Sequence, residues 1–292
     1  MATIPETRTD MDDRATLEQK HERLQQAIRD LGSVVVAFSA GVDSTLVLKV
    51  AVDALGPENV VAATSNSASV PSEDLTHARL ITEALRVEHV EITTDEFENG
   101  DYLANPTNRC YHCKTALYDR LARLLQERGI KAIINGANAD DYFDFRPGLQ
   151  AAKEYAVRAP AAEAGLTKAD IRCLSQKLGL PTHDMPASPC LSSRVPYGEA
   201  ITPEKLRMIE EAERYLHGLG IRECRVRHHD MLARIEVPPQ SFSQLIQADR
   251  VRELLRHFRT LGYHYITLDL QGFRSGSLNE VITIGGQGPT HG

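Results

Sequence analysis

The 292-residue sequence contains no apolar run long enough for a membrane-spanning helix, which needs about 20 such residues. Residues 1–14 are polar and of mixed charge, so they lack the apolar segment of a secretory signal peptide. The net charge of −7 does not favour a surface that binds nucleic acid. These absences predict a soluble, cytoplasmic protein with no membrane partner and no nucleic-acid partner.

The cysteines do not form the set expected of a secreted disulfide framework. There are five of them, an odd number in a chain of this length. Thiol or metal chemistry is therefore the better interpretation. A basic extension and further Cys-x-x-Cys pairs are also absent from the sequence.

What is present suggests an α/β domain followed by a smaller α+β domain. Strands alternate with helices up to about residue 180, which predicts a Rossmann-like parallel sheet covered by helices on both faces. After Pro196 the order becomes helix, strand, strand, helix, strand, which predicts a small antiparallel sheet with helices on one side. We predict a disordered tail at 1–13, a nucleotide-binding domain at 14–185 and a smaller α+β domain at 186–292. The helices are expected at about 14–31, 45–56, 72–85, 114–128, 167–179, 202–219 and 242–261, and the strands at 34–38, 59–65, 87–93, 130–135, 224–227, 232–237 and 265–270.

Residues 34–45 predict a phosphate-binding loop between a strand and a helix. The loop offers backbone N–H groups, hydroxyl donors and the positive end of a helix to an anion. The P-loop of kinases is excluded, because Asp43 stands where that motif has lysine. Asp43 would repel phosphate without a cation, so we expect it to hold Mg²⁺ on a nucleotide. The nucleotide-binding candidates here are Ser39, Gly41, Val42, Asp43, Ser44 and Thr45.

Ala40 stands in the same loop where a second glycine is expected. Its methyl group fits if the residue has a negative φ, and we predict that it does.

Three more candidates for the nucleotide follow the strand at 130–135. Gly136 and Asp140 come at the carboxyl end of that strand, where parallel sheets bind ligands, and Arg146 follows with a charge that suits phosphate. Further on, Thr167 and Asp170 have the spacing of a helix cap. Lys168 and Arg172 point away from the apolar side of that helix, where they could face phosphate, but surface solvation is the preferred interpretation for each.

The cysteines Cys110, Cys113 and Cys190 suit several kinds of chemistry. The first two form a Cys-x-x-Cys pair that we place just before a helix, and the third lies near Arg194, a setting that favours thiolate. They could bind a [4Fe–4S] cluster, bind structural zinc with His112 or His183, or form a redox disulfide. Cys173 and Cys224 have apolar neighbours, so we predict that both are buried.

The second domain carries a set of arginines with two interpretations. Arg274 lies in a Gly-flanked loop after the last strand, and with Arg225 and Arg227 it could clamp an anion. Alternatively, Arg225 and Arg227 pair with Glu236 across two exposed strands. The sequence does not favour one over the other.

Together these motifs resemble the LarE family. The resemblance rests on Ser39 to Thr45, Asn135 to Asp141 with Arg146-Pro147-Gly148, Pro186 to Gly198 (PASPCLSSRVPYG), Arg225 to Glu236 and Gly272 to Asn279. The first of these is similar to the SGGxDS loop of ATP pyrophosphatases. LarE proteins are ATP-dependent sulfur transferases in the assembly of the nickel-pincer nucleotide cofactor of lactate racemase.

The resemblance implies a substrate, a site and a mechanism. The substrate would be pyridinium-3,5-biscarboxylic acid mononucleotide, whose carboxylates become thiocarboxylates through an acyl adenylate. It implies ATP and Mg²⁺ as cofactors and a homo-oligomer built from trimers, with a hexamer among the options. The residues it places at the substrate are Arg194, Arg225, Arg227, Glu236, Arg274 and Ser275.

The resemblance also implies two possible sources of the transferred sulfur. In members with only the cysteine matching Cys190, that residue gives up its own sulfur and becomes dehydroalanine. This chain also has Cys110 and Cys113, which matches the branch of the family thought to bind a [4Fe–4S] cluster through three cysteines.

Two other functions remain as alternatives. A tRNA thiolation enzyme would also join such a loop to three cluster cysteines, and a non-catalytic nucleotide-binding module would need the loop alone. A glutamine-dependent amidotransferase is disfavoured because the chain has no amidase domain.

Overall fold

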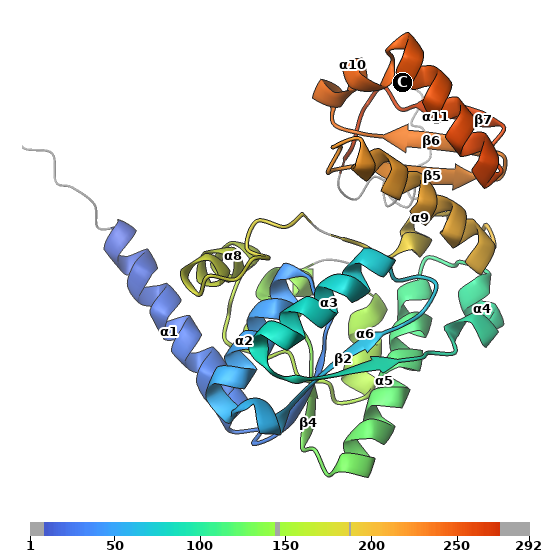
Figure 1. Ribbon diagram of the computed structural model, residues 1–292. Helices are drawn as coiled ribbons and strands as arrows, with labels where there is room; N and C mark the ends of the chain where they lie inside the picture. Colours follow the sequence, from blue (N-terminus) through green and yellow to red (C-terminus); the bar gives the residue numbers. More distant parts are fainter. Residues whose placement is uncertain (1–8, 144–146, 187, 275–292) are drawn as a thin grey trace, which may run out of the picture. The chain divides into compact units, whose positions relative to one another are not determined.

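The computed structural model describes residues 9–143, 147–186 and 188–274, which form two compact units (Figure 1). The first unit comprises 1–96 and 108–188, and the second comprises 97–107 and 189–292. The chain therefore enters the second unit twice. In the described part of the chain, no helix has the length and apolar character needed to cross a membrane.

The first unit is built on a parallel sheet, as the alternating pattern predicts. The strand order in the structure is β3-β2-β1-β4. Its strands consist of β1 (Val34–Ala37), β2 (Val60–Ser65), β3 (Glu88–Ile92) and β4 (Ala132–Ile134). Because the two edges of β1 pair with β2 and β4, β1 lies inside the sheet, and the loop that follows it opens at the carboxyl edge. The predicted fold class is confirmed.

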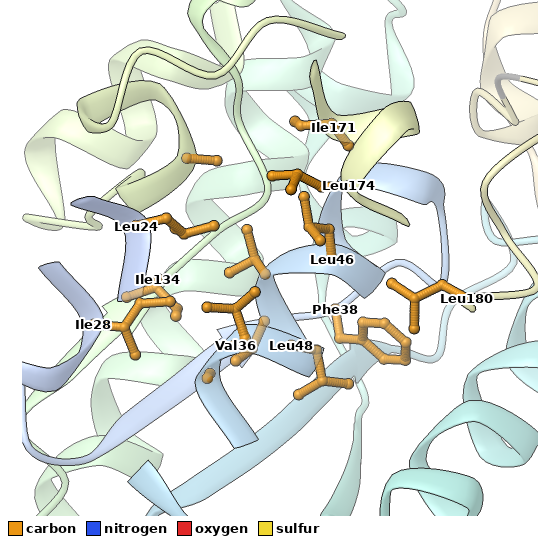
Figure 2. Packing of buried hydrophobic residues seen from close by; sticks show 14 of the residues in the cluster. Leu24, Ile28, Val36, Phe38, Leu46, Leu48, Ile134, Ile171, Leu174 and Leu180 are labelled. Carbon is orange, nitrogen blue, oxygen red and sulfur yellow. The ribbon is translucent and has the colours of Figure 1, made fainter. Parts of the chain in front are cut away.

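Helices cover both faces of this sheet. They are α1 (Thr9–Arg29), α2 (Val42–Leu55), α3 (Ser72–Leu85), α5 (Arg109–Arg128), α6 (Pro147–Glu154), α7 (Pro160–Glu163) and α8 (Lys168–Lys177). Val36 points into a core shared with Leu24 and Leu46 (Figure 2), whereas Val35 packs on the other face against Leu117 of α5. This alternation along one strand separates the two cores.

Two helices of the first unit begin earlier than the sequence analysis placed them. Helix α1 starts at Thr9 rather than near residue 14. Helix α5 starts at Arg109 rather than at Lys114, so the Cys-x-x-Cys pair lies inside the helix and not before it. The prediction was wrong there because Asn108 precedes the helix without a side-chain cap, leaving no start signal to read.

The second unit contains a three-stranded sheet of the order β5-β6-β7. Strand β6 is antiparallel to β5 but parallel to β7, so the expected all-antiparallel sheet is wrong. The helical crossover between β6 and β7 returns the chain to the same end of the sheet, which makes these neighbours parallel. The elements are α4 (Gly100–Leu103), α9 (Pro203–Gly218), β5 (Arg225–His229), β6 (Leu232–Glu236), α10 (Phe242–Leu245), α11 (Ala248–Leu261) and β7 (Tyr265–Leu268).

The predicted helix 242–261 is also divided. Helix α10 ends at Leu245 and α11 starts at Ala248, because Gln247 has an extended backbone with φ −63° and ψ 136°. Thr202 caps α9 as predicted, since its side chain accepts a hydrogen bond from the N–H of Lys205 at 3.2 Å. Short 3-10 helices occur at η1 (Pro57–Asn59), η2 (Glu96–Glu98), η3 (Ala139–Phe143), η4 (Leu191–Arg194) and η5 (Pro239–Ser241).

Candidate active site

The loop between β1 and α2 is held together by the Ser44 hydroxyl. This Oγ accepts a hydrogen bond from the Ser39 N–H at 3.3 Å, lies 3.1 Å from the Ser39 Oγ, and donates to the Gly41 carbonyl at 3.2 Å. Next to it, the Thr45 Oγ1 is buried and has no hydrogen-bond partner among the described residues. The loop thus leads directly into the N-terminus of α2, where backbone N–H groups lack helical partners.

Ala40 has a left-handed backbone, which contradicts the predicted negative φ. Its φ is +58° and its side chain is 1% exposed. The left-handed region is unfavourable for any residue with a Cβ. The methyl group nevertheless packs into the core of the first unit, and this burial offsets part of the backbone cost.

Gly136 allows the loop after β4 to pack against the start of α2. A Cβ at this position would lie 2.7 Å from the Ser44 nitrogen and 2.9 Å from the Ser44 Cα. Gly41 differs, because its φ of −76° suits any residue and an added Cβ would meet only the Ser39 Oγ, at 3.5 Å. The protein's own packing therefore explains Gly136 but not Gly41.

Asp43 has two partners, and they come from two other segments. Its Oδ1 accepts a hydrogen bond from the Asn138 Nδ2 at 3.2 Å, and its Oδ2 forms an ion pair with the Lys168 Nζ. The Asp43 side chain remains 25% exposed. The loop, the turn after β4 and the first residue of α8 thus meet at one carboxylate.

Asp140 forms hydrogen bonds to both partners of Asp43, Lys168 and Asn138. One of its carboxylate oxygens accepts the Lys168 N–H at 2.8 Å, and its own N–H donates to the Asn138 Oδ1 at 2.9 Å. The Asn138 N–H in turn donates to Asp141 at 3.0 Å. Asp140 therefore fixes both residues that contact Asp43.

Sequence analysis did not single out Asn138 and left Lys168 on a solvated face. The available signal was the cap formed by Thr167 and Asp170, which the structure confirms as a reciprocal capping box. That cap makes Lys168 the first helical residue, facing the sheet edge. Arg172 is partly buried, and it donates to the carbonyls of His183 and Met185, each at 2.8 Å.

Cys110 and Cys113 are the second and fifth residues of α5. Residues three apart on a helix lie on the same face, and here Cys110 is exposed and Cys113 partly so. Among the described residues, no group of three His, Cys, Asp or Glu side chains is arranged to bind a metal ion. Arg146 and Ser275, two predicted site residues, lie outside the described residues.

The other two cysteines gave one correct and one incorrect prediction. Cys224 is buried, as expected, within the core of the second unit. Cys173 is exposed on α8, because the buried face of that helix is formed by Ile171 and Leu174 on either side of it.

Cys190 immediately precedes η4 and is partly exposed. Arg194 at the end of η4 is only 2% exposed, and it donates to the carbonyls of Pro189 and Cys190, the latter at 2.9 Å. The same guanidinium binds both carboxylate oxygens of Glu213, at 3.0 and 2.8 Å. The backbone that carries Cys190 is thus fixed to α9 through a buried ion pair.

Residues 97–107 also anchor this segment through hydrogen bonds. The Tyr102 hydroxyl lies 2.8 Å from the Ser192 Oγ, and both side chains are buried. Asn105 donates to the carbonyls of Val195 and Pro196, at 3.2 and 2.7 Å.

Arg227 and Glu236 pair across β5 and β6, but they are buried rather than exposed. Arg227 binds the two oxygens of Glu236 at 3.1 and 2.9 Å, and it also donates to the Ser193 carbonyl at 2.8 Å. Their side chains are 7% and 1% exposed. The pair therefore links the sheet to the segment that follows Cys190.

Arg225 lies among other cations. Burial, followed by the positive charge of Arg194, lowers the pKa of Arg225 to about 10, and Arg227 contributes in the same direction. Its guanidinium lies 5.1 Å from the ring centre of Phe273, the residue before Arg274. Of its two neighbouring arginines, Arg194 is paired with the buried carboxylate of Glu213 and Arg227 with that of Glu236.

Comparisons with known proteins relate most of the chain to one family. The NAD synthase family model matches residues 16–104, which include the loop and α2. An uncharacterized protein of Synechocystis sp. is 48% identical over 267 residues, covering 91% of this chain and 99% of the relative. A second uncharacterized protein, from Methanocaldococcus jannaschii, is 30% identical over 173 residues, covering 59% of this chain and 67% of the relative.

One relative carries a functional name. The pyridinium-3,5-bisthiocarboxylic acid mononucleotide synthase of Lactiplantibacillus plantarum is 41% identical over 271 residues, which cover 92% of this chain and 97% of the relative. The similarity spans both units, including the loop at Asp43 and the segment at Cys190. The chain therefore belongs to the family of this synthase, the LarE family that its motifs resemble.

Proposed function

We propose that this protein is an ATP-dependent sulfur transferase that makes pyridinium-3,5-bisthiocarboxylic acid mononucleotide. The observation that carries the proposal is the 41% identity to the named synthase over nearly the full length of both chains. The substrate is the corresponding biscarboxylic acid mononucleotide, and the product belongs to the assembly of the nickel-pincer nucleotide.

The first step activates a carboxylate. An oxygen of the substrate carboxylate attacks the α-phosphorus of ATP, pyrophosphate leaves, and an acyl adenylate forms. This step is needed because a free carboxylate has no good leaving group. We assign ATP binding to the loop residues Ser39 to Thr45, with Asp43 as a ligand of Mg²⁺, which would neutralise phosphate charge. Gly41, which the protein's own packing does not require, would let phosphate approach the backbone.

We assign the substrate's phosphate to the arginines of the second unit. Arg225 and Arg274 would contact it, while Arg194 and Arg227, each already bound to a buried carboxylate, would mainly position the segment around Cys190. If Arg274→Ala leaves the substrate concentration dependence of activity unchanged, this assignment is wrong.

The second step replaces AMP with sulfur. If Cys190 is the donor, its thiolate attacks the acyl carbon and AMP leaves. Loss of the Cα proton then breaks the Cβ–S bond, which yields the thiocarboxylate and leaves dehydroalanine. Alternatively, Cys110, Cys113 and Cys190 would hold a [4Fe–4S] cluster, which would supply a replaceable sulfide. We favour the cluster because two thiols on one helix face suit metal binding and a sacrificial enzyme does not need them.

An anaerobic iron count tests the sulfur source. We expect about four irons per chain for this cluster type, lost in Cys110→Ser, Cys113→Ser and Cys190→Ser. Cys173→Ser is the matched control, since it removes an exposed thiol of the same unit as Cys110. An iron-free protein that loses H₂S from Cys190 in intact-mass analysis after one turnover would establish the sacrificial route instead.

Two further measurements test the alternatives. Substrate-dependent pyrophosphate release separates an adenylating enzyme from a non-catalytic nucleotide-binding module, which releases none. A salt-sensitive gel shift with tRNA would favour a tRNA thiolation enzyme. We also propose a homo-oligomer built from trimers, which light scattering of the purified protein tests.

A further inference from the structure

A row of alternating charges crosses the three-stranded sheet of the second unit. Arg227 lies on β5, Glu236 and Arg234 lie on β6, and Asp269 follows β7 directly. Glu236 accepts hydrogen bonds from Arg227 at 3.1 and 2.9 Å and lies 3.3 Å from the guanidinium of Arg234. The same guanidinium forms an ion pair with Asp269. Arg234 therefore lies between two carboxylates.

Glu236 does not require Arg234 as a counter-ion, because Arg227 already binds both of its oxygens. The register of the sheet also places Arg234 directly opposite Arg227, and like charges in that arrangement destabilise a strand pair. The pairing of β5 with β6 alone would thus favour an uncharged side chain at position 234. The carboxylate that depends on this arginine is Asp269, whose side chain is 12% exposed.

Asp269 builds the turn that leads to Arg274. One of its carboxylate oxygens binds Arg234, and the other accepts the N–H of Gln271 at 2.9 Å. The carbonyl of Asp269 accepts the N–H of Gly272 at 3.0 Å. The two carboxylate oxygens thus connect Arg234 to the turn.

The turn is in turn attached to the end of β6. The Phe273 N–H donates to the carbonyl of Val237 at 3.0 Å. A Cβ on Gly272, whose φ is +75°, would lie 3.1 Å from the same carbonyl oxygen, so the turn and the strand end approach closely. The Phe273 ring centre lies 5.1 Å from the guanidinium of Arg225. Both arginines assigned to the substrate phosphate, Arg225 and Arg274, therefore depend on where this turn lies.

We propose that Arg234 is a positioning residue, whose ion pair orients Asp269 so that the turn holds Arg274 in place for the substrate phosphate. Arg234 acts through Asp269 and does not contact the phosphate. This inference rests on the proposed role of Arg274 in binding the mononucleotide. Loss of Arg234 should therefore weaken the affinity for the substrate and leave unchanged the affinity for MgATP, which is assigned to the first unit.

Calorimetry with the full-length protein measures both affinities. We expect Arg234→Met and Asp269→Asn each to weaken binding of pyridinium-3,5-biscarboxylic acid mononucleotide about tenfold, close to the loss of one charge-assisted hydrogen bond. Asparagine has one acceptor oxygen, which can bind Arg234 or the turn but not both. Because both substitutions break the same connection, the double variant should be no weaker than either single variant.

Two further variants serve as controls. Arg234→Lys, which keeps the charge, should retain more substrate affinity than Arg234→Met. Arg214→Met removes an arginine of similar exposure from an ion pair on α9, and it should match the wild type. Urea unfolding verifies that each variant is folded. Asp269→Asn, which keeps the shape of the side chain, tests the inference even if Arg234→Met does not fold.

The outcomes separate this inference from the proposed function. If Arg274→Ala binds the mononucleotide as tightly as the wild type, the anion site is misassigned and the inference fails with it. If Arg274→Ala weakens binding but Arg234→Met and Asp269→Asn do not, only the inference fails. Two single losses that multiply in the double variant would show that Arg234 contacts the substrate itself, which also overturns the positioning role. Equal weakening of MgATP binding would overturn it as a general loss of structure.

Discussion

At the scale of single residues, Ala40 carries a backbone conformation that its side chain disfavours. The left-handed φ of +58° costs about 1–2 kcal/mol for a residue with a Cβ. The buried methyl group returns about 0.8 kcal/mol. The opposing contributions explain how alanine can occupy a position where a glycine is expected.

The substitution Ala40→Gly tests this balance. Glycine relieves the backbone but loses the methyl contact and gains freedom in the unfolded chain, so we expect a small change in the free energy of unfolding. The control Ala51→Gly, in the helical interior of the same core, has no strain to relieve. In urea unfolding, Ala40→Gly should be less destabilising than Ala51→Gly by about 1 kcal/mol or more. Equal losses of unfolding free energy in the two variants would contradict backbone strain at Ala40.

The sequence predicted the chemistry of the loop residues better than their contacts. Asp43 was identified from its place in the motif, but its partner Lys168 is 125 residues away, and no local pattern connects them. Cys173 was misassigned for a related reason. Apolar neighbours in sequence predict burial only if they share its helix face, and Cys173 lies on the opposite one.

At the scale of elements, the start of α2 depends on contact with the loop after β4. A Cβ on Gly136 would meet backbone atoms of Ser44, which cannot rotate away as a side chain could. The close approach of these two segments brings Asn138 within reach of Asp43.

Replacing Gly136 should therefore push the two segments apart. We expect Gly136→Ala to lower the free energy of unfolding by about 1–3 kcal/mol, the usual cost of overpacking, and to weaken nucleotide binding. Gly218→Ala is the control, because a Cβ there meets nothing within 4 Å at the end of α9. It should leave stability unchanged or raise it by less than about 1 kcal/mol. Denaturant unfolding measures both, and a neutral Gly136→Ala would refute the close contact.

The buried ion pair between η4 and α9 supports a second prediction at this scale. Glu213→Gln leaves the charge of Arg194 buried without its counter-ion, which typically costs about 3–5 kcal/mol. The matched control is Glu211→Gln on the same helix, whose partner Arg214 is 42% exposed. That exposed pair should contribute less than about 1 kcal/mol. If urea unfolding shows that both variants lose a similar free energy of unfolding, the buried pair stabilises the protein no more than the exposed pair does.

Element boundaries followed the sequence where a cap or a periodic pattern existed. Helix α3 occupies Ser72–Leu85 as predicted, and α9 begins at its predicted cap. The direction of β7 and the early start of α5 were missed. The first depends on how a crossover returns the chain, and the second on a helix start that no side chain caps.

At the scale of the whole molecule, stability should depend on pH through the second unit. Burial, followed by the charge of Lys205, lowers the pKa of His228 to about 4. In the unfolded chain a histidine binds its proton near pH 6.5. Between these values only the unfolded state is protonated, so acidification favours unfolding.

We therefore expect stability to fall as the pH drops from about 6.5 towards about 4. His228→Gln removes the titrating group, and its free energy of unfolding should vary less over this interval. His264→Gln, at an exposed position in the same unit, should keep the wild-type pH dependence. Urea unfolding at a series of pH values measures all three proteins. If the free energy of unfolding of His228→Gln varies with pH as strongly as that of the wild type, groups other than His228 cause the acid sensitivity.

The division into two units could be predicted only in part. The change of character after Pro196 indicated a second domain, and the chain passes into the second unit at Pro189. No local pattern indicated that residues 97–107 belong there too. Their contacts with residues 192–201 span about 90 positions, and Tyr102 and Asn105 look locally like ordinary loop residues.

Because residues 97–107 belong to the second unit, the order in which the protein can fold on the ribosome is constrained. Residues 97–107 leave the ribosome long before Ser192, Val195 and Pro196, so Tyr102 and Asn105 must wait for their partners to be synthesised. The strands of the first unit can pair once β4 has emerged, with this stretch still an unpaired loop. A fragment starting at residue 189 would lack Tyr102 and Asn105 altogether. The segment around Cys190 is therefore completed late in synthesis, and only in a chain that retains its first half.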